Sequence, residues 1–447
     1  MSDTPNPVLD ARQTAAKHTY GTWRRQKGWN PLHVVSASGS HFTDSDGKKY
    51  LDFSSQLMCS NLGHDNKAVI DAIKKQAEEL SFAAPGYATT ARMELVNELL
   101  QVLPKGLTKF FFTTSGTEAN EAAVKIARMY TGKHKIISRY ASYHGSTAAS
   151  IALTGDFRRW PVEANCAVPG TVFAPDANCY RCPLKQTFPS CDLACADYVE
   201  YQIEREGNVA AMILEPIVGT NGVLLPPPGY LKRIREITKR HGVLLICDEV
   251  MSGWGRTGEW FVSSAEGILP DILTTAKGIS SAYVPLGLTA TTDEIAKFFD
   301  ENFFAHGHTY EAHPITLGPA VAAIREYKRL GLLERTKTVG EAFGKKLRAM
   351  CAKHPSVGDV RGRGLFWAVE LVKDQKTKKP FNTQAEKLAG KPLMTDQVTG
   401  KMNQLGVVCV GWASHFVIAP PLVITEAELD QGLAALDEGL KLADASL

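Results

Sequence analysis

Short apolar runs rich in branched residues alternate with amphipathic segments along most of the chain. Such runs are typical of strands that are buried in a sheet; they lie at 109–112, 135–138, 210–214, 243–247, 272–273 and 286–290. Helical spacing or helix boundary signals predict helices between them, at 67–80, 90–103, from Ser115 to about Tyr130, and at 230–240. This alternation predicts an α/β domain.

The two ends of the chain have a different pattern. Residues 41–53 predict a hairpin, because Gly47 in its Ser-Asp-Gly turn accepts a positive φ. After a long helix from about Ala320, the C-terminal part predicts a helix at 339–353, strands at 357–359 and 365–371, and a final helix after Ile424. Residues up to about Trp29 are polar and irregular, and we expect an arm that packs on a partner subunit. A length of 447 residues suits one large and one smaller domain.

Composition excludes several classes of function. A hydrophobic content of 44% and a charged content of 22% are ordinary for a soluble enzyme. The net charge of +3 is small, so nucleic acid is not an expected partner. No stretch is long enough to span a membrane, and the N-terminus lacks the apolar core of a signal peptide. The chain also has nine cysteines, which fit a reducing compartment. Together these features predict a cytoplasmic protein.

Candidate chemistry is concentrated between Gly242 and Gly278. The strand at 243–247 ends at Asp248, and ligands of open α/β sheets bind at the carboxyl ends of strands. Lys277, which has small neighbours, follows the next strand. Such a lysine can form an imine with an aldehyde, and a carboxylate can hold a pyridine nitrogen protonated, which is the arrangement used with pyridoxal 5′-phosphate (PLP). Separately, the two residues would be an ordinary loop lysine and a turn aspartate.

A second motif, Ser115-Gly116-Thr117, stands between a strand and a helix. Hydroxyls and free N–H groups at a helix start bind anions such as phosphate. On its own the motif would more often be a simple N-cap. With the Asp248 and Lys277 pair downstream, we interpret it as a phosphate site.

The order of these motifs resembles that of class III (subgroup II) PLP-dependent aminotransferases, and the resemblance covers nearly the whole chain. It implies the fold-type I architecture, with a mostly parallel sheet between helices in a large domain and a small α+β domain built from both chain ends. The expected boundaries are 1–65 for the N-terminal segment, 66–325 for the large domain and 326–447 for the small domain. The resemblance also implies a homodimer, or a dimer of dimers, with shared active sites.

The resemblance assigns further roles. Tyr143, in the motif Tyr143-His144-Gly145, would cover one face of the cofactor ring, and Val250 would cover the other. Glu215 would lie near the ring hydroxyl, and Thr309 would reach the phosphate of the neighbouring subunit. The loop around Leu57 and Met58 would border the substrate pocket. Without the resemblance, a core aromatic, a structural carboxylate, a loop hydroxyl and packing residues are the alternatives.

Three segments are similar to the ω-amino acid branch, particularly taurine–2-oxoglutarate aminotransferases: VPLG at 284–287, GTNGVLLPPPGYL and DEVMSGWGRTGEWF. This implies an amine donor such as taurine, β-alanine or 4-aminobutyrate, and 2-oxoglutarate or pyruvate as acceptor. Many relatives bind a substrate carboxylate with an arginine before Pro-Pro-Leu. Here no arginine or lysine occurs between Lys401 and Pro420, which leaves His415, with Arg158, Arg159 or Arg256 as substitutes from elsewhere.

Alternatives remain open from the residues alone. A PLP-dependent racemase, mutase or decarboxylase would share every motif. A class I aldolase would use a lysine imine without PLP, against which the phosphate motif and Asp248 argue. Two closely spaced cysteine pairs could bind zinc or an iron–sulfur centre, or could be free thiols in a surface loop: Cys179, Cys182, Cys191 and Cys195. No metal is expected for the PLP chemistry, and a non-catalytic metal-binding scaffold is the remaining option.

Overall fold

The computed structural model describes residues 10–447, and a seven-stranded mixed sheet forms its largest layer. The strands run in the order β4 (Leu107–Thr113), β10 (Gly287–Thr292), β9 (Ile272–Thr275), β8 (Leu244–Asp248), β7 (Val209–Leu214), β5 (Lys135–Arg139) and β6 (Thr171–Ala174). Strand β10 is antiparallel to both of its neighbours, and β9, β8, β7, β5 and β6 are mutually parallel. The predicted α/β class with a mostly parallel sheet is therefore confirmed.

Strand β7, in the centre of the sheet, is apolar along its whole length because both faces of the sheet are covered. In β7, Met212 joins one core cluster and Ile213 another. The first cluster contains residues of α8 (Ala194–Glu206) and α9 (Tyr230–Arg240), and the second contains residues of α5 (Gly116–Thr131). Alternate side chains of a strand point to opposite faces, so a continuous apolar run is required here.

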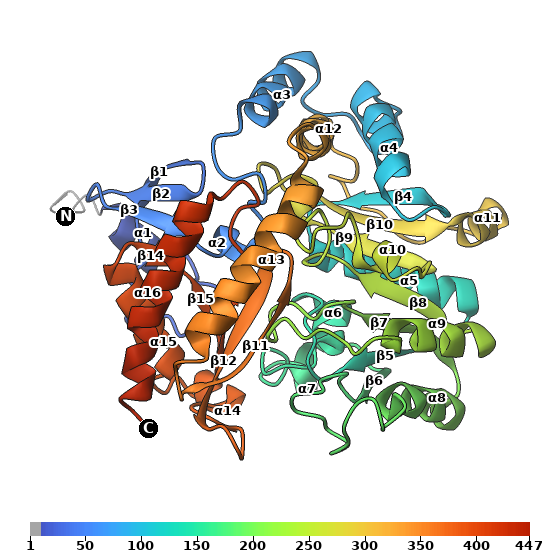
Figure 1. The fold of residues 1–447 in the computed structure, drawn as a ribbon. Coiled ribbons are helices and arrows are strands. Elements are labelled where there is room, and N and C mark those ends of the chain that lie inside the picture. Colours follow the sequence, from blue (N-terminus) through green and yellow to red (C-terminus); the bar gives the residue numbers. More distant parts are fainter. Residues whose placement is uncertain (1–9) are drawn as a thin grey trace, which may run out of the picture.

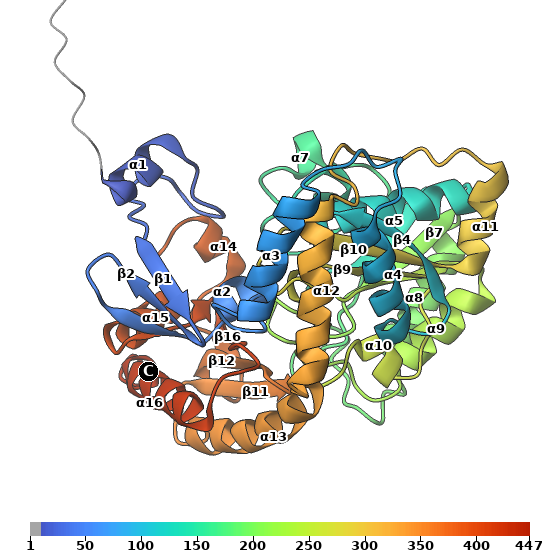
Figure 2. The ribbon, with the colours of Figure 1, turned by 90° about the horizontal axis from the view of Figure 1, so that it is seen from above.

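The other helices of the large domain lie around this layer (Figure 1). They are α3 (Lys67–Glu79), α4 (Thr90–Val102), α6 (Ala148–Leu153), α7 (Glu163–Cys166), α10 (Val262–Ala265), the short 3₁₀ turn η1 (Lys277–Ile279), α11 (Asp293–Glu301) and α12 (Pro314–Arg329). Helices α3 and α12 lie side by side between the two parts of the molecule (Figure 2). The helices predicted at 67–80, 90–103, from Ser115 and at 230–240 lie within two residues of α3, α4, α5 and α9, whereas α12 begins at Pro314, before the expected start near Ala320.

The smaller part is built from both ends of the chain. One sheet contains β1 (Val34–Ser38), β2 (His41–Asp44), β3 (Lys49–Asp52) and β14 (Val407–Val408); the other contains β11 (Val357–Arg363), β12 (Phe366–Asp374), β16 (His415–Ile418) and β15 (Val410–Gly411), with β13 (Lys379–Pro380) beside β12. Strand β14 pairs in parallel with β3, so the chain ends meet in one sheet. The helices here are α2 (Ser55–Met58), α13 (Leu332–Cys351), α14 (Gln384–Leu388), α15 (Met394–Gln404) and α16 (Glu426–Asp444).

The N-terminal segment and the predicted domain boundary at residue 325 differ in part from what the sequence suggested. The N-terminal segment is not wholly irregular, because α1 (Ala11–His18) forms after Asp10, whose side chain accepts a hydrogen bond from the backbone N–H of Gln13. Residues 1–9 of the predicted arm lie outside the described residues. The predicted boundary at residue 325 falls inside α12, and the three domain ranges remain a prediction.

Within residues 10–447, no helix has both the length and the apolar character needed to cross a membrane.

The feature that matters for function is the edge of the large sheet where β4, β8 and β9 end. Thr113, Asp248 and Thr275 are their last residues. The segments that follow them carry the Ser115 motif, Val250 and Lys277 to the same edge, as expected for an open α/β sheet.

Candidate active site

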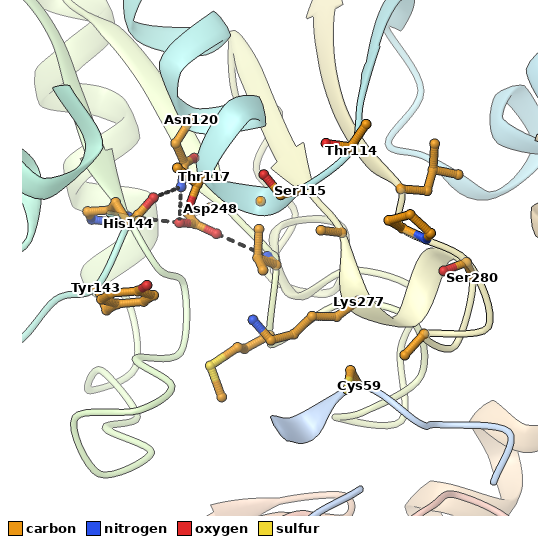
Figure 3. A pocket seen from close by; sticks show the side chains of 18 of the residues that line it. Cys59, Thr114, Ser115, Thr117, Asn120, Tyr143, His144, Asp248, Lys277 and Ser280 are labelled. Atoms are coloured by element: carbon orange, nitrogen blue, oxygen red, sulfur yellow. Dashed lines mark hydrogen bonds and ion pairs between the residues drawn. The ribbon is translucent and has the colours of Figure 1, made fainter. Parts of the chain in front are cut away.

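A cavity of about 490 Å³ opens at this edge of the sheet (Figure 3). Nine of the residues singled out from the sequence line it: Ser115, Gly116, Thr117, Tyr143, His144, Glu215, Asp248, Val250 and Lys277. They come from five separate segments of the chain, and only the fold brings them together. A concave pocket with a few convergent polar groups is the expected form of a small-molecule site.

Asp248 is the centre of a buried hydrogen-bond network. Its Oδ2 accepts a hydrogen bond from Nδ2 of Asn120 at 2.8 Å and lies 2.8 Å from Nδ1 of His144. Its Oδ1 accepts one from the backbone N–H of Val250 at 3.0 Å. Asn120 is itself held, because its amide also donates to the carbonyl of His144 and its oxygen accepts from Thr274. The carboxylate is therefore fixed in position before any ligand binds.

Lys277 extends into the cavity toward the side that carries Tyr143 and Asp248 (Figure 3). Its backbone has a φ of +50°, a left-handed conformation that costs a non-glycine residue free energy. The turn after it supports this conformation, since the N–H of Ala282 donates to the carbonyl of Lys277. Burial lowers the pKa of the Lys277 amine from its ordinary value, while Asp248 and Glu215 act in the opposite direction. Burial thus favours the uncharged, nucleophilic form.

The Ser115 motif opens helix α5 toward the cavity. The Ser115 hydroxyl accepts a hydrogen bond from the N–H of Glu118 and so caps the helix. The N–H groups of Gly116 and Thr117, in the first turn, have no partner within the helix. A Cβ at position 116 would lie 2.9 Å from a methyl carbon of Val250, so glycine allows the helix start to approach this residue. The motif is both an N-cap and a pair of donors for an anion.

Tyr143 and Glu215 also line the cavity. The carboxylate of Glu215 accepts hydrogen bonds from the N–H of Tyr143 at 3.1 Å and from that of Gly219 at 2.7 Å. Burial raises the pKa of Glu215, and the charge of Asp248 raises it further. The Tyr143 ring has the Arg158 guanidinium 3.7 Å from its centre and the edge of Trp23 against it.

These residues fit a flat aldehyde cofactor that carries a phosphate. The lining offers an amine, a fixed carboxylate, an aromatic ring, the branched side chain of Val250 and the start of a helix. Nε2 of His144 is buried and has no hydrogen-bond partner among the described residues, so the contact of Nδ1 with Asp248 is the only hydrogen bond of the imidazole ring there. That donor set matches the PLP site implied by the sequence.

Two predicted substrate residues lie elsewhere. Arg256 is fully buried, and its terminal nitrogens donate to Leu365, Pro420, Ser55 and Asn61. It joins the large domain to the small one, which contradicts a substrate contact. His415 donates Nε2–H to the carbonyl of Thr220 at 2.9 Å, and burial lowers its pKa to about 4. It is uncharged near neutral pH and cannot be the cation that we expected.

The loop after β3 also differs from the prediction. Met58 is buried in the core cluster beneath α8 and α9, and Leu57 is 60% exposed. Neither lines the cavity, whereas the next residue, Cys59, does. The irregular backbone of α2, which has φ of +60° at Gln56, turns these side chains away from the positions that a regular helix would give. Thr309 is exposed and outside this chain's cavity, so its role toward a second subunit remains a prediction.

Sequence reasoning missed two residues with clear roles in the geometry. Asn120 lies three residues after the Ser115-Gly116-Thr117 motif and one helical turn after Gly116, and this spacing places it on the face of α5 that meets Asp248. Arg158 was considered only as a carboxylate clamp. Its guanidinium is instead bound to Asp156 and to the Thr220 hydroxyl while it stacks on Tyr143. No local pattern in the sequence indicates that stacking.

The cysteine pairs lie outside the cavity and form no disulfide among the described residues. Burial and the neighbouring thiols raise the pKa of Cys195 to about 11, so the four thiols influence one another. Among the side chains that the structure describes, the only group with three possible metal-ligand atoms mutually within 4.8 Å is Glu200, Glu204 and His241. There Glu200 already pairs with Arg240 and His241.

Nearly the whole chain is similar to known proteins. Residues 23–440 match the family described as Aminotransferase class-III. A solved structure of taurine:2-oxoglutarate aminotransferase from Bifidobacterium kashiwanohense, in complex with PLP and glutamate, is 36% identical, with a TM-score of 0.92 and 98% of each chain covered. The taurine–pyruvate aminotransferase of Bilophila wadsworthia is 34% identical over 94% of this chain and 95% of its own. The leucine/methionine racemase of Thermococcus litoralis is 34% identical over 92% and 90%.

Proposed function

This chain belongs to the class-III aminotransferases, and we propose that it transfers the amino group of a short ω-amino acid or related primary amine to a 2-oxo acid. Class-III aminotransferases are PLP-dependent, and the lining of the cavity fits this cofactor. The observation that carries the assignment is the convergence of Lys277, Asp248 and Tyr143 on one cavity beside a helix start. Taurine, β-alanine and 4-aminobutyrate are the proposed donors, and 2-oxoglutarate or pyruvate is the proposed acceptor.

When bound, PLP supplies an aldehyde that takes up amino groups and a ring that accepts electrons. We assign to Lys277 Nζ the transfer of a proton from the substrate carbon, because burial favours its uncharged form. The Asp248 carboxylate would hold positive charge on the ring nitrogen, with Asn120 and His144 fixing its orientation. Ser115, Gly116 and Thr117 would bind the phosphate.

The ω-amino acid assignment is supported by three facts. The strand before Pro-Pro-Leu lacks a basic residue, and its only histidine is uncharged near neutral pH. The solved relative with a TM-score of 0.92 is named for taurine and 2-oxoglutarate, and another relative is named for taurine and pyruvate. A cavity without the usual carboxylate clamp favours donors whose acid group lies away from the amine.

The decisive experiment is a matrix of donors and acceptors. Taurine, β-alanine, 4-aminobutyrate, 1,4-diaminobutane and an α-amino acid are each assayed with pyruvate and with 2-oxoglutarate. We expect the first three to be the best donors. If the α-amino acid exceeds all of them in kcat/KM, the proposed donor class is wrong, whereas the family assignment is unaffected.

A racemase is the second candidate, because one relative with 34% identity is named as a leucine/methionine racemase. The two functions differ in what happens to the amino group. A racemase returns it to the same carbon, and it needs no oxo acid. Racemisation of leucine or methionine without an oxo acid, at a higher rate than transfer from any donor, would favour this candidate.

Under the main proposal the protein is a homodimer in the cytoplasm. The dimer is supported by the family's use of a threonine at the position of Thr309, which is exposed on the single chain. The cytoplasmic location rests on the sequence features given above. Sedimentation of the purified protein and fractionation of cells that express it would test the two statements.

A further inference from the structure

A second cavity, of about 670 Å³, lies next to the reaction cavity. It is formed by three separate segments: the N-terminal stretch at 23–27, the residues at 157–162 that follow α6, and residues 387–396, from the end of α14 to the start of α15. Six of its lining residues are basic, namely Arg24, Arg25, Lys27, Arg158, Lys387 and Lys391, and a single acidic residue, Asp396, lines it. We call this cavity the basic vestibule.

Most of this positive charge is not neutralised by the protein. Arg158 is paired with Asp156, and Lys391 lies 3.6 Å from Glu386. The other four basic residues form no ion pair with any residue of 10–447. A concave site with uncompensated charge of one sign concentrates small ions of the opposite sign.

Lys387 is the clearest example of a positive charge in the basic vestibule that no acidic residue neutralises. Burial lowers the pKa of its amine, and the charges of Arg158 and Arg24 lower it further, while Asp396 acts in the opposite direction. Its Nζ lies 5.8 Å from the centre of the Trp412 ring and makes no ion pair with any described residue. A bound anion would stabilise the charged form of this side chain.

The basic vestibule shares a wall with the reaction cavity. Tyr143 lines the reaction cavity, and Arg158, which lines the basic vestibule, lies 3.7 Å from its ring centre. Trp23, whose ring is perpendicular to the Tyr143 ring, lines the vestibule as well. The Trp412 ring, 5.1 Å from Arg158, continues the wall to Lys387. An anion in the vestibule is therefore beside the side chain that borders the reacting groups.

We propose that the basic vestibule binds the carboxylate or sulfonate group of incoming substrates and so selects small organic acids for the reaction cavity. This inference rests on the proposed function, and it names the residues that replace the missing carboxylate clamp. Arg24, Arg25, Lys27 and Lys387 supply the charge, and the paired Arg158 supplies the shared wall. Selection at an entrance changes the rate of capture more than the chemical step, and it weakens as salt increases.

The test begins with binding alone. The holoenzyme is titrated calorimetrically with glutarate and with ethanesulfonate, which carry the acid groups but no amine or ketone. The double variant Arg24→Met/Lys387→Met is compared with Lys239→Met, which removes an exposed positive charge on α9, outside the vestibule. We expect roughly tenfold weaker binding in the double variant at low salt, and binding close to wild type in Lys239→Met. Equal affinities in all three proteins would overturn the proposal.

Kinetics provide the second readout. In the double variant kcat/KM for taurine should fall about tenfold and lose much of its salt dependence, whereas kcat should change little. The cationic donor 1,4-diaminobutane should be affected much less, or improved. If both donors lose activity equally, the residues have a general structural role and the proposal is wrong.

The proposed substrate class and the proposed acid binding in the basic vestibule are tested by separate results. If no acid-bearing amine is a donor in the wild type, the proposed substrate class fails. The calorimetric result with glutarate and ethanesulfonate involves no turnover, and it then decides the basic vestibule separately.

Discussion

The guanidinium carbon of Arg158 lies 3.7 Å from the centre of the Tyr143 ring, and Asp156 holds that guanidinium through hydrogen bonds at 3.0 and 3.1 Å to its Nε. Arg158 and Asp156 are almost completely buried. A cation held in this way attracts the electron-rich face of the ring and restricts its position. Tyr143 is thus supported on the face covered by Arg158, and we expect this support to be needed for cofactor binding.

This relationship can be tested with the double variant Asp156→Asn/Arg158→Met. Removing the arginine alone would leave a buried carboxylate unpaired, at a cost of about 3–5 kcal/mol, so both partners are replaced. A cation–π contact is worth roughly 0.5–2 kcal/mol, and we expect the Kd of PLP for the apoenzyme to rise by about tenfold. Tyr143→Phe, which keeps the ring, should bind PLP much more tightly than the double variant. Unchanged PLP affinity in the double variant would exclude the supporting role.

Lys277 should be the residue that binds the cofactor covalently. The holoenzyme is reduced with borohydride, digested and mapped by mass spectrometry. We expect the label on Lys277, because burial favours the nucleophilic form of its amine. Lys277→Met should carry no label at this position. A label on another lysine of the wild-type protein would show that the central assignment is wrong.

Asp248→Asn should separate cofactor binding from catalysis. Asparagine keeps the shape of the side chain and part of the network with Asn120 and His144, but it has no negative charge to stabilise a protonated ring nitrogen. We expect the variant to retain some PLP and to lose turnover by several orders of magnitude. Single-turnover rates with a saturating donor measure the loss directly. Near-normal rates would show that the charge of Asp248 is not required.

The pH dependence of apoenzyme stability should reveal the buried amine. The pKa of Lys277 is lowered in the folded state, so between the folded and the unfolded pKa the unfolded chain binds more protons. The free energy of unfolding therefore gains a contribution that rises as the pH increases through this window. Urea titrations of wild type and Lys277→Met, over a pH series, should show a smaller rise in the variant. Parallel pH profiles would argue against a lowered pKa.

The sequence predicted the elements of the large domain well because each carries its own local signal. The run 243–247 predicts a strand, and β8 spans Leu244–Asp248. The helix predicted from Ser115 to about Tyr130 is α5, which ends at Thr131 where Gly132 caps it with a φ of +65°. The nine cavity residues were found for a related reason. Each lies in a motif at a strand end or a helix start, and the fold brings such ends together.

The substrate residues were predicted poorly because their roles depend on long-range packing. Arg256 is an arginine near a candidate site in the sequence, but its side chain points into the junction with Pro420 and Asn61. His415 could be a cation by its residue type, but its burial lowers the pKa to about 4, well below neutral pH. Likewise Arg24 and Lys387 are separated by most of the chain, and no sequence pattern places them in one cavity.

The last prediction concerns Thr309 and assembly. If its hydroxyl binds the phosphate of PLP in a second subunit, it donates to a charged acceptor, and such a hydrogen bond is worth roughly 1.5–3 kcal/mol. Thr309→Ala should then weaken PLP binding by about one to two decades. Thr338→Ala, which alters an exposed threonine on α13, is the matched control and should bind PLP like the wild type.

The same contact should couple the cofactor to the dimer. A ligand held by two chains binds the assembled state preferentially, so PLP should lower the dissociation constant of the wild-type dimer. In Thr309→Ala this stabilisation should be smaller, because one of the two chains has lost a contact to the phosphate. Analytical ultracentrifugation of the apo and holo forms of both proteins measures the difference. If PLP leaves dissociation of the wild-type dimer unchanged, the site is not shared between subunits, and Thr309 is an ordinary loop residue.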